Sequence, residues 1–350
     1  MLRDRLNRLL TAVSLGAAVF LALTGCASSD SNSGTLIVLN KDGASASLFD
    51  RSTGDEVARL DVGEGPHEVA VSPDGNTAVV CNYGQDTPGN TLSVMDIPTQ
   101  RVVRTIPLGR HTRPHGIVYM GDERVTVTAE GSRRLLVVNV TSGIIEAAIG
   151  TEQETSHMVA TTPDASRAFV ANIRSGTVSA IDLTERELIE IIETGAGAEG
   201  VDVSPDGAEV WISNRAADTV TILDAQTLEE LAEFHAPSFP IRVKFTPDGE
   251  RVLVSCARSG DVAVYDAATR EELGRVSMFG QGVETGRSII GGSGPLPIGI
   301  LIPPDGKYAY IANTNADTVT VIDLDTLEIA SRFDAGPEPD GMAWSPVEFE

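Results

Sequence analysis

Three of the five histidines occupy equivalent positions in a unit that repeats along the sequence. They lie in Pro66-His67-Glu68, Pro114-His115-Gly116 and Ser156-His157-Met158. Neutral imidazoles beside a carboxylate suit Zn, Cu or Fe, and a bare histidine cluster can act in proton transfer. The alternative is that each histidine only hydrogen-bonds the adjacent repeat. The pattern therefore leaves both a metal site and a structural role open.

Later repeats place charged residues at or beside the same position. The expected ligand-binding set is His67, His115, His157, Glu199, Arg242 and Asp340. Within it, the three histidines are the candidate ligands of a transition metal. No residue is assigned as catalytic, because the sequence shows no Ser-His-Asp arrangement, no phosphate-binding glycine loop and no His-Glu-x-x-His motif.

The repeated unit is clearest in Gly200–Thr227. Apolar alternation at Val201 and Val203, and again at Val210 and Ile212, predicts two strands. Pro205-Asp206-Gly207 predicts the tight turn between them, since Pro presets φ and Gly accepts a positive φ. Matching turns begin at Pro73, Pro163, Pro247 and Pro304, and the step from Pro163 to Pro205 to Pro247 is 42 residues each time.

A period near 40 residues with four short strands per unit predicts a β-propeller, because one small sheet cannot bury both faces without neighbours. The first copy lacks its first strand, whereas Asp340–Pro346 is a first strand without successors. We therefore predict an all-β fold over residues 35–346: a seven-bladed propeller of four-stranded antiparallel blades, closed by N- and C-terminal strands that share one blade. The other six blades are His67–Leu108, His115–Ile149, His157–Thr194, Glu199–His235, Pro240–Val276 and Pro297–Asp334.

The repeats in Pro205–Asp224 and Pro304–Asp323, with the pattern PDGxxxxVxN…TVxVID, resemble the YVTN-type (YncE-like) propellers of bacterial exported proteins. This resemblance spans nearly all of residues 35–346 and implies the propeller fold. Relatives with related blades include binding or surface proteins, a lactonase group, amine dehydrogenase large subunits and the propeller of haem d1 enzymes. This chain has no Cys-x-x-Cys-His for covalent haem and no separate cofactor domain.

Chain direction places the Pro-Asp-Gly turns on one face of the ring and the starts of the first strands on the other. The first strands line the central channel, so the candidate site residues should converge near its mouth. The irregular segments fall on this second face: residues 83–90, 109–114 and 274–297. Long loops in compact folds are usually functional or disordered, and residues 276–296 are expected to be one or the other.

Residues 1–25 have a basic start and an apolar run, which indicates a secretion signal. Leu23-Thr24-Gly25-Cys26 resembles the bacterial lipoprotein cleavage box, which implies that Cys26 becomes the lipidated first residue. Ala27 after the cysteine implies sorting to the outer membrane in two-membrane bacteria. Residues 26–34 are then the lipidated cysteine and a flexible tether, and the membrane is one partner.

The net charge is −24, and it becomes −26 without residues 1–25, which contain three Arg and one Asp. A surface this acidic repels phosphate backbones, so nucleic acid is not an expected partner. We expect an exported monomer that binds a protein or a small ligand at its loop-rich face and channel mouth. The alternative is a metal- or cofactor-dependent enzyme, of redox or lactonase type, that uses the histidine cluster.

Overall fold

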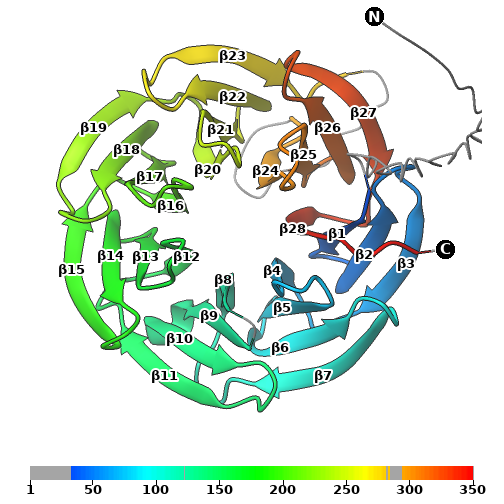
Figure 1. The fold of residues 1–350 in the computed structure, drawn as a ribbon, viewed down its shortest axis with the longest axis horizontal. Helices are drawn as coiled ribbons and strands as arrows, with labels where there is room; N and C mark the ends of the chain where they lie inside the picture. The colour runs from blue at the N-terminus through cyan, green and yellow to red at the C-terminus, as the bar shows by residue number, and fades with distance from the viewer. Residues whose placement is uncertain (1–32, 122, 281–282, 284–293, 350) are drawn as a thin grey trace, which may run out of the picture. The chain divides into compact units, whose positions relative to one another are not determined.

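A computed structural model describes residues 33–121, 123–280, 283 and 294–349. Seven four-stranded antiparallel sheets stand as blades around a central channel (Figure 1). In each blade the first strand lines the channel, and the fourth strand runs along the outer rim. This arrangement confirms the all-β, seven-bladed fold that the repeats predicted. No helix among the described residues is long and apolar enough to cross a membrane.

Six blades are continuous in sequence, and their strands follow one another outward from the channel. The second, third and fourth blades contain β4 (Pro66–Val71), β5 (Thr77–Gly84), β6 (Pro88–Asp96), β7 (Arg101–Pro107); β8 (Pro114–Met120), β9 (Arg124–Ala129), β10 (Arg134–Asn139), β11 (Ile145–Gly150); β12 (Ser156–Thr161), β13 (Arg167–Asn172), β14 (Thr177–Asp182), β15 (Glu187–Glu193). The fifth, sixth and seventh contain β16 (Ala198–Val203), β17 (Glu209–Asn214), β18 (Thr219–Asp224), β19 (Glu230–His235); β20 (Pro240–Phe245), β21 (Arg251–Cys256), β22 (Asp261–Asp266), β23 (Glu272–Ser277); β24 (Pro297–Leu301), β25 (Tyr308–Asn313), β26 (Thr318–Asp323), β27 (Glu328–Asp334). A short 3-10 turn, η1 (Glu130–Ser132), follows β9.

The first blade joins the two ends of the described chain, as expected. Its inner strand is β28 (Pro339–Ser345), which pairs with β1 (Thr35–Asn40), and β2 (Ser45–Asp50) and β3 (Glu56–Asp61) complete it. The register places Leu36 opposite Trp344. Ser345 Oγ donates to the carbonyl oxygen of Gly75 in the second blade at 2.7 Å. The closing strand is therefore held by its own blade and by the next one.

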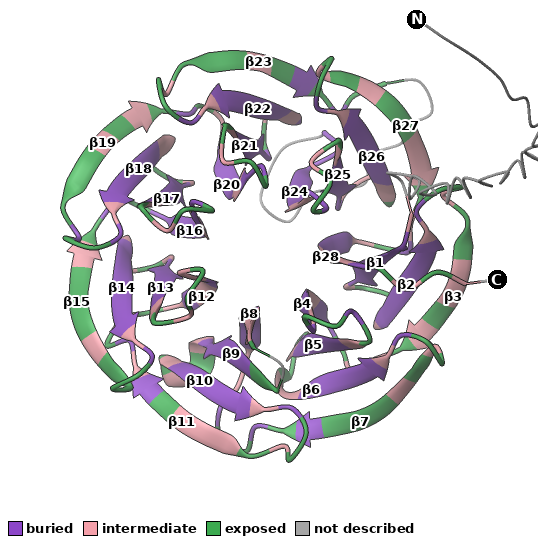
Figure 2. Cartoon of the chain, viewed as in Figure 1, coloured by how far each residue is buried: buried purple, intermediate pink, exposed green. Residues whose placement is uncertain are grey.

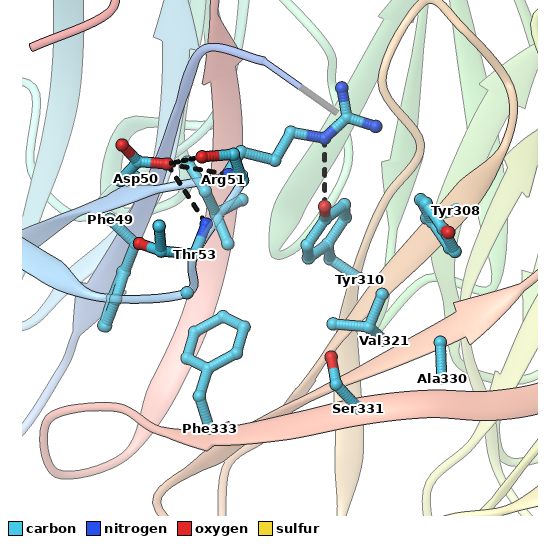
Figure 3. Close-up of a pocket in the computed structure, with 13 residues that line it drawn as sticks. Phe49, Asp50, Arg51, Thr53, Tyr308, Tyr310, Val321, Ala330, Ser331 and Phe333 are labelled. Atoms are coloured by element: carbon cyan, nitrogen blue, oxygen red, sulfur yellow. Dashed lines mark hydrogen bonds between the residues drawn. The ribbon is translucent and has the colours of Figure 1, made fainter. Parts of the chain in front are cut away.

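Arg51 fastens the first blade to the seventh. It stands directly after β2, where the other six blades have a buried apolar residue: Ile97, Val140, Leu183, Ala225, Ala267 and Leu324. Its Nε donates to the Tyr310 hydroxyl at 2.9 Å, and its Nη1 lies 2.5 Å from the Asp305 carboxylate. A cavity of about 240 Å³ lies beside this contact, between the two blades (Figure 3). At this one position, the junction between the first and seventh blades thus has an ionic contact, whereas the other blades have an apolar side chain there.

The hydrophobic core lies between successive blades. One cluster combines Val79 and Leu92 of the second blade with Val127 and Leu136 of the third. The second and third strands of each blade are largely buried, whereas the outer strands are exposed along much of their length (Figure 2). Each blade buries its faces only against its neighbours. The ring therefore has to close for every blade to be covered on both sides.

The Pro-Asp-Gly turns define one face of the ring, which we call the turn face. Two aspartate positions repeat there, one in the turn and one at the end of the third strand: Asp50, Asp74, Asp96, Asp164, Asp182, Asp206, Asp224, Asp248, Asp266, Asp305 and Asp323. Hydrogen bonds from nearby hydroxyl and backbone groups lower the pKa of seven of them: Asp50, Asp74, Asp164, Asp206, Asp224, Asp266 and Asp323. Burial alone raises the pKa of an eighth, Asp248, but hydrogen bonds from Thr246 and Glu250 outweigh it and lower that pKa. The turn face is therefore persistently anionic near neutral pH.

The opposite face, which we call the loop face, carries a neutral repeated residue instead. Four second strands end there in asparagine, and a fifth, β5, has asparagine two residues before its end: Asn40, Asn172, Asn214, Asn313 and Asn82. Each amide nitrogen donates to hydroxyl groups of the following strand, as Asn82 does to Thr91 and Ser93 at 2.9 and 3.0 Å. The asparagine ring is therefore a structural feature of the repeat.

Every outer strand pairs with its neighbour through a register shift, for example between Val94 and Met95 opposite β7. Such bulges bend a strand and increase its twist. The expected signal peptide (1–25), Cys26 and most of the expected lid or disordered loop at 276–296 lie outside the described residues.

Candidate functional site

Every inner strand also begins with a register shift, and this irregularity builds the channel mouth. In β4, Pro66 pairs with Asn82 and Val69 with Val80, so His67 and Glu68 are left between two ladder pairs. Equivalent shifts occur in the other six inner strands. In each inner strand, one residue directly follows the first ladder pair and so lies within the shift. These residues are His67, His115, His157, Glu199, Ile241, Ile298 and Asp340. These residues come from seven blades and lie at one level of the channel.

The structure brings the three predicted histidines together in a row. The ring centroids of His67 and His115 are 4.9 Å apart, and those of His115 and His157 are 3.5 Å apart with an interplanar angle of 33°. Tyr83 contacts the row from the side, with its ring centroid 4.4 Å from that of His67. Only His115 and His157 lie nearly face to face, since the rings of His67 and His115 meet edge-on at an interplanar angle of 61°.

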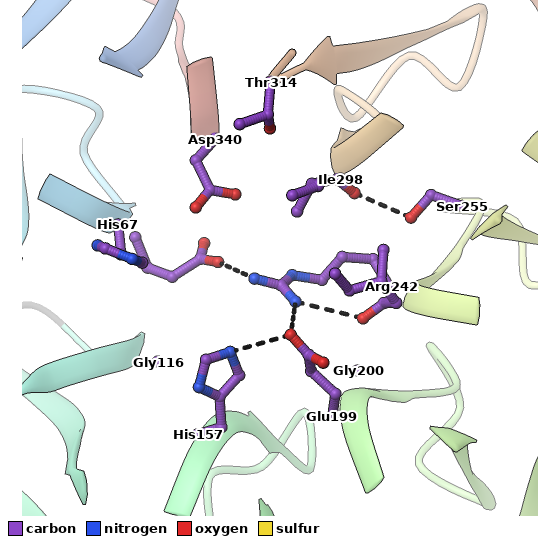
Figure 4. Close-up of polar contacts among 12 residues, drawn as sticks. His67, Gly116, His157, Glu199, Gly200, Arg242, Ser255, Ile298, Thr314 and Asp340 are labelled. Carbon is purple, nitrogen blue, oxygen red and sulfur yellow. Dashed lines mark hydrogen bonds and ion pairs between the residues drawn. The ribbon is translucent and has the colours of Figure 1, made fainter. Parts of the chain in front are cut away.

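His157 is clamped between two carboxylates. Its Nδ1 lies 2.5 Å from Glu130 Oε1, and its Nε2 lies 3.3 Å from Glu199 Oε1 (Figure 4 shows the second contact). Burial by itself lowers the pKa of His157, but the hydrogen bonds to Glu130 and Glu199 outweigh it and raise that pKa above the ordinary value. His157 is therefore the histidine of the row that favours the imidazolium form.

The other two histidines favour the neutral form. Burial lowers the pKa of His67 to about 4, although its Nδ1 donates to the Gly65 carbonyl at 2.8 Å. Burial and the neighbouring His157 lower the pKa of His115, which is 1% exposed and whose Nδ1 has no partner among the described residues. The row thus combines one histidine that favours the charged form with two that favour the neutral form.

Arg242 crosses the channel and closes it below the histidines. Its Nη2 lies 2.9 Å from Glu68 on β4, and its Nη1 lies 3.4 Å from Glu199 on the adjacent β16 (Figure 4). Arg215 pairs with the second oxygen of Glu199. Burial alone raises the pKa of Glu199, but His157 and the two arginines outweigh it and lower that pKa to about 2. Glu199 is therefore the ionised centre of the network.

Asp340 completes the network from the closing blade. Its Oδ2 lies 3.4 Å from Lys41 Nζ, while its Oδ1 is buried without a hydrogen-bond partner among the described residues. Burial alone raises the pKa of Asp340, but Lys41 and Arg242 outweigh it and lower that pKa. All six predicted site residues therefore gather at the mouth, and Glu199, Arg242 and Asp340 are each less than a tenth exposed.

Glycines allow the inner strands to approach one another closely around the crossing Arg242. In the layer just below the residues that follow the first ladder pairs, four of the seven inner strands have glycine: Gly116, Gly200, Gly299 and Gly341. A Cβ on Gly299 would stand 2.1 Å from the Asp340 carbonyl oxygen, and one on Gly341 would stand 2.2 Å from that of His67. The inner strands thus approach too closely here for any side chain, and the Arg242–Glu68 pair fills the axis of this layer.

The candidate metal site gains no support from this geometry. Among the described residues, no three His, Cys, Asp or Glu side chains are placed to hold a metal ion. Both nitrogens of His157 already face carboxylates, and a protonated imidazole has no lone pair to offer a metal. The arrangement is instead that of a charge-balanced network of ion pairs and hydrogen bonds.

A cavity of about 340 Å³ continues down the channel beyond Arg242 and Glu68. All seven inner strands contribute to its wall, which extends to the last residues of β12 and β24, Thr161 and Leu301. These strand ends belong to the turn face. The network therefore separates the loop face from a channel that extends toward the turn face.

Arginine and aromatic residues surround the mouth on the loop face. Arg113 lies over the Tyr83 ring, with Cζ 4.7 Å from the centroid. Phe239 contacts both Arg215 and Arg258, at 5.1 and 4.1 Å. Phe279, just after β23, is 51% exposed. Tyr83, Arg113 and Phe279 lie in the irregular segments that the sequence had placed on this face, whereas Arg215, Phe239 and Arg258 lie in other connections of the same face.

Sequence analysis did not assign five network members to the site: Lys41, Glu68, Tyr83, Glu130 and Arg215. Glu130 occupies the position in its repeat where most others have asparagine, but β9 ends at Ala129 and Glu130 begins η1. This offset turns its carboxylate toward His157 and the Tyr83 hydroxyl, which donates to it at 2.7 Å. The alignment of repeats could have assigned Glu68 to the site, because it is a charged residue at a position that is glycine in most other repeats.

Residues 112–285 match a family model described as a YNCE-like beta-propeller. A comparison with curated proteins gives no significant match. Among solved structures, hydrazine synthase of Kuenenia stuttgartiensis is similar, with 20% identity, a TM-score of 0.70, and coverage of 84% of this chain and 93% of that one. At this identity the likeness concerns the fold alone. The chain is therefore a closed propeller of seven blades, and residues 112–285 match the YNCE-like β-propeller family.

Proposed function

We propose that the protein is a binding module that holds a partner protein or a small ligand on its loop face, over the channel mouth. The observation that carries this proposal is the gathering of arginine and aromatic side chains around a mouth closed by a buried ionic network. Arg, Tyr and Phe are enriched in protein interfaces, and they contribute most where their positions are fixed in advance.

The network fixes these side chains. The guanidinium of Arg215 pairs with Glu199 and also contacts the ring of Phe239, which is itself buried. Tyr83 is tied in the same way through its hydroxyl to Glu130, and Arg113 lies on its ring. A surface held from below loses little conformational freedom on binding, which favours affinity.

The charge distribution favours the loop face as well. The repeated aspartates make the turn face anionic, whereas the repeated residue of the loop face is a neutral asparagine. An acidic group of a partner is repelled at the turn face and finds exposed arginines, such as Arg110 and Arg174, on the loop face. Carboxylate-bearing ligands therefore suit this surface, while nucleic acid is disfavoured by the net charge of −24.

The binding proposal is tested by cross-linking in the exporting cell, followed by quantitative recovery of attached molecules. Arg110→Glu with Arg174→Glu reverses two exposed charges on the loop face. Arg101→Glu is the matched control, since Arg101 is exposed at the start of β7 on the turn face. A specific partner should be lost from the double variant and kept by the control. Equal recovery from all three proteins would contradict the assignment to the loop face.

We also propose that this exported monomer is anchored by a lipid on Cys26, on the strength of the Leu23-Thr24-Gly25-Cys26 pattern. Cys26→Ser removes the only thiol that can carry the lipid in that pattern. The variant should move from the membrane fraction to the soluble fraction, as measured by blotting. Wild-type protein found entirely in the soluble fraction would exclude the anchor.

The second candidate function is an enzyme that uses the histidine row. It is favoured by the pairing of a charged His157 with a neutral His115, since active sites often hold neighbouring groups whose pKa values are driven apart. Metal analysis and absorption spectra of the purified protein address this alternative. Stoichiometric metal or cofactor that His115→Ala removes would favour the enzyme over the binding module.

A further inference from the structure

We propose that the central channel is a second binding site, open toward the turn face, that takes the ammonium group of a small aliphatic amine with Glu68 as its counter-ion. This site goes beyond the proposed function, which concerns the loop face. It rests on the cavity, on the placement of carboxylates at its inner end, and on the charge of the face toward which it extends.

The channel has the size and wall chemistry of a small-molecule site. Its volume of about 340 Å³ falls in the range of ligand pockets, which are mostly apolar with a few polar groups. Polar and apolar groups share the wall, and successive inner strands contribute its apolar side chains: Val69, Ile117, Met158, Val201, Ile300 and Met342. The charged residues on the wall nearer the turn face, Asp202 and Lys244, pair with each other at 3.1 Å. An alkyl chain therefore fits the walls without leaving an unpaired charge there.

The inner end of the channel offers a carboxylate oxygen that lacks a donor. Glu68 lines the cavity, and its Oε1 accepts from Arg242, whereas its Oε2 accepts no hydrogen bond from a described residue. Asp340 stands one level nearer the loop face and does not line the cavity; its side chain points toward the channel axis (Figure 4), and its negative charge adds to that of Glu68. An ammonium group supplies three N–H donors and so matches an inner end that is rich in acceptors.

The cations near this end are already engaged. Arg242 is shared between Glu68 and Glu199, Lys41 pairs with Asp340, and Arg215 pairs with Glu199. His157 lies on the loop side of Glu199, between two carboxylates, and His67 and His115 favour the neutral form. Each positive charge is therefore offset by a carboxylate. Burial raises the pKa of Glu68 above its ordinary value despite the neighbouring Arg242, and its Oε2 has no donor among the described residues, so an ammonium group bound there would favour the ionised carboxylate.

The turn face favours cations on their way to the channel. Eleven repeated aspartates lie on that face, around the seven inner-strand ends. A face lined by charge of one sign raises the local concentration of oppositely charged ligands and repels ligands of its own sign. Amines should consequently be favoured over carboxylates of the same length, and each buried methylene should add about fourfold in affinity.

The proposal is tested by titration calorimetry on a soluble fragment, residues 27–350, which lacks Cys26. Three probes are compared at neutral pH: hexylammonium, ethylammonium and hexanoate. The ring closes within residues 35–345, so this chain contains the complete propeller. Hexylammonium should bind more tightly than ethylammonium, and hexanoate should not bind. Hexanoate binding as tightly as hexylammonium, or no difference between the two amines, would overturn the proposal.

Three variants locate the site. Glu68→Gln should weaken hexylammonium about tenfold or more, because a charged hydrogen bond is lost. Ile300→Phe narrows the channel without changing its charge and should also weaken binding, which covers the case in which Glu68→Gln disturbs Arg242. Asp206→Asn, a turn-face change outside the cavity, should bind as the wild type does. If Asp206→Asn weakens binding as much as Glu68→Gln, the amine binds the acidic surface and the channel site is refuted. Wild-type affinity in both channel variants would refute it as well.

Discussion

The neutral state of His67 should make the propeller sensitive to acid. His67 is partly buried at the channel mouth, its ring lies against Tyr83 and His115, and its Nδ1 donates to the Gly65 carbonyl. Burial lowers its pKa to about 4 from an ordinary value of 6.5. Between these two values the unfolded chain binds a proton at this residue and the folded chain does not.

The sign and size of the effect follow from this difference. Since the unfolded state binds more protons between pH 6.5 and pH 4, the free energy of unfolding falls as the pH is lowered through this window. A change of one in pKa corresponds to about 1.4 kcal/mol, so the difference between 6.5 and about 4 gives at most about 3.5 kcal/mol. Partial exposure of His67 to water reduces this figure.

His67→Asn isolates this contribution, because asparagine retains an N–H donor near the position of Nδ1 and does not titrate. Urea unfolding of wild type and variant would be measured from pH 7 to pH 4. The wild type should lose about 2–3 kcal/mol more over this range than the variant, while aspartates and glutamates titrate equally in both. His235→Asn, a change at an exposed histidine on β19, should leave the wild-type profile unaltered. Parallel pH profiles for wild type and His67→Asn would show that the mouth does not hold His67 neutral.

Three further outcomes are expected from the packing. Deleting Asp340–Glu350 removes the inner strand of the first blade and exposes the backbone groups of β1, so the whole ring should melt at a lower temperature; unchanged melting would mean that β28 does not close the ring. Gly299→Ala should lower the free energy of unfolding in urea by about 2–4 kcal/mol, because the new Cβ would meet the Asp340 carbonyl oxygen. Gly274→Ala on an outer strand is the control: its Cβ meets only a flexible leucine, so the free energy of unfolding should change by less than about 1 kcal/mol. Arg51→Leu should be more stable than Arg51→Ala by about 1 kcal/mol or more, because leucine fills a position that is apolar in the other blades; equal stability would show that volume at this seam is unimportant.

The architecture was predictable because each repeat carries its own local signals. Turn residues such as Pro205-Asp206-Gly207 fix strand ends, and alternation fixes which face is buried. Counting units then gives the number of blades. The orphan strand at Asp340–Pro346 was sufficient to predict how the ring closes. The meeting of the three histidines followed from the same alignment, since equivalent positions of adjacent blades are close around a narrow channel.

The chemistry of the mouth was less predictable, because it depends on side chains that break the repeat. Arg242 reaches Glu68 across the channel, over 174 positions in sequence, and no periodicity connects them. The state of each histidine is set by partners that the alignment does not pair, above all by Glu130, which a one-residue offset moves out of the strand-end position. The expectation of a metal rested on residue types alone, whereas the carboxylates around His157 favour a proton in that place.

The register shift in each outer strand has a consequence for how copies of the protein meet. The rim consists of seven strand edges, and a regular edge is a template on which a strand of a second molecule can pair and start a fibre. In β7, β19 and β23 the residue in the bulge is also exposed and apolar, namely Val103, Leu231 and Leu273. The bulge interrupts the ladder at the point where such residues would otherwise promote stacking. Propellers crowded on a surface can therefore contact one another through their outer strands and separate again.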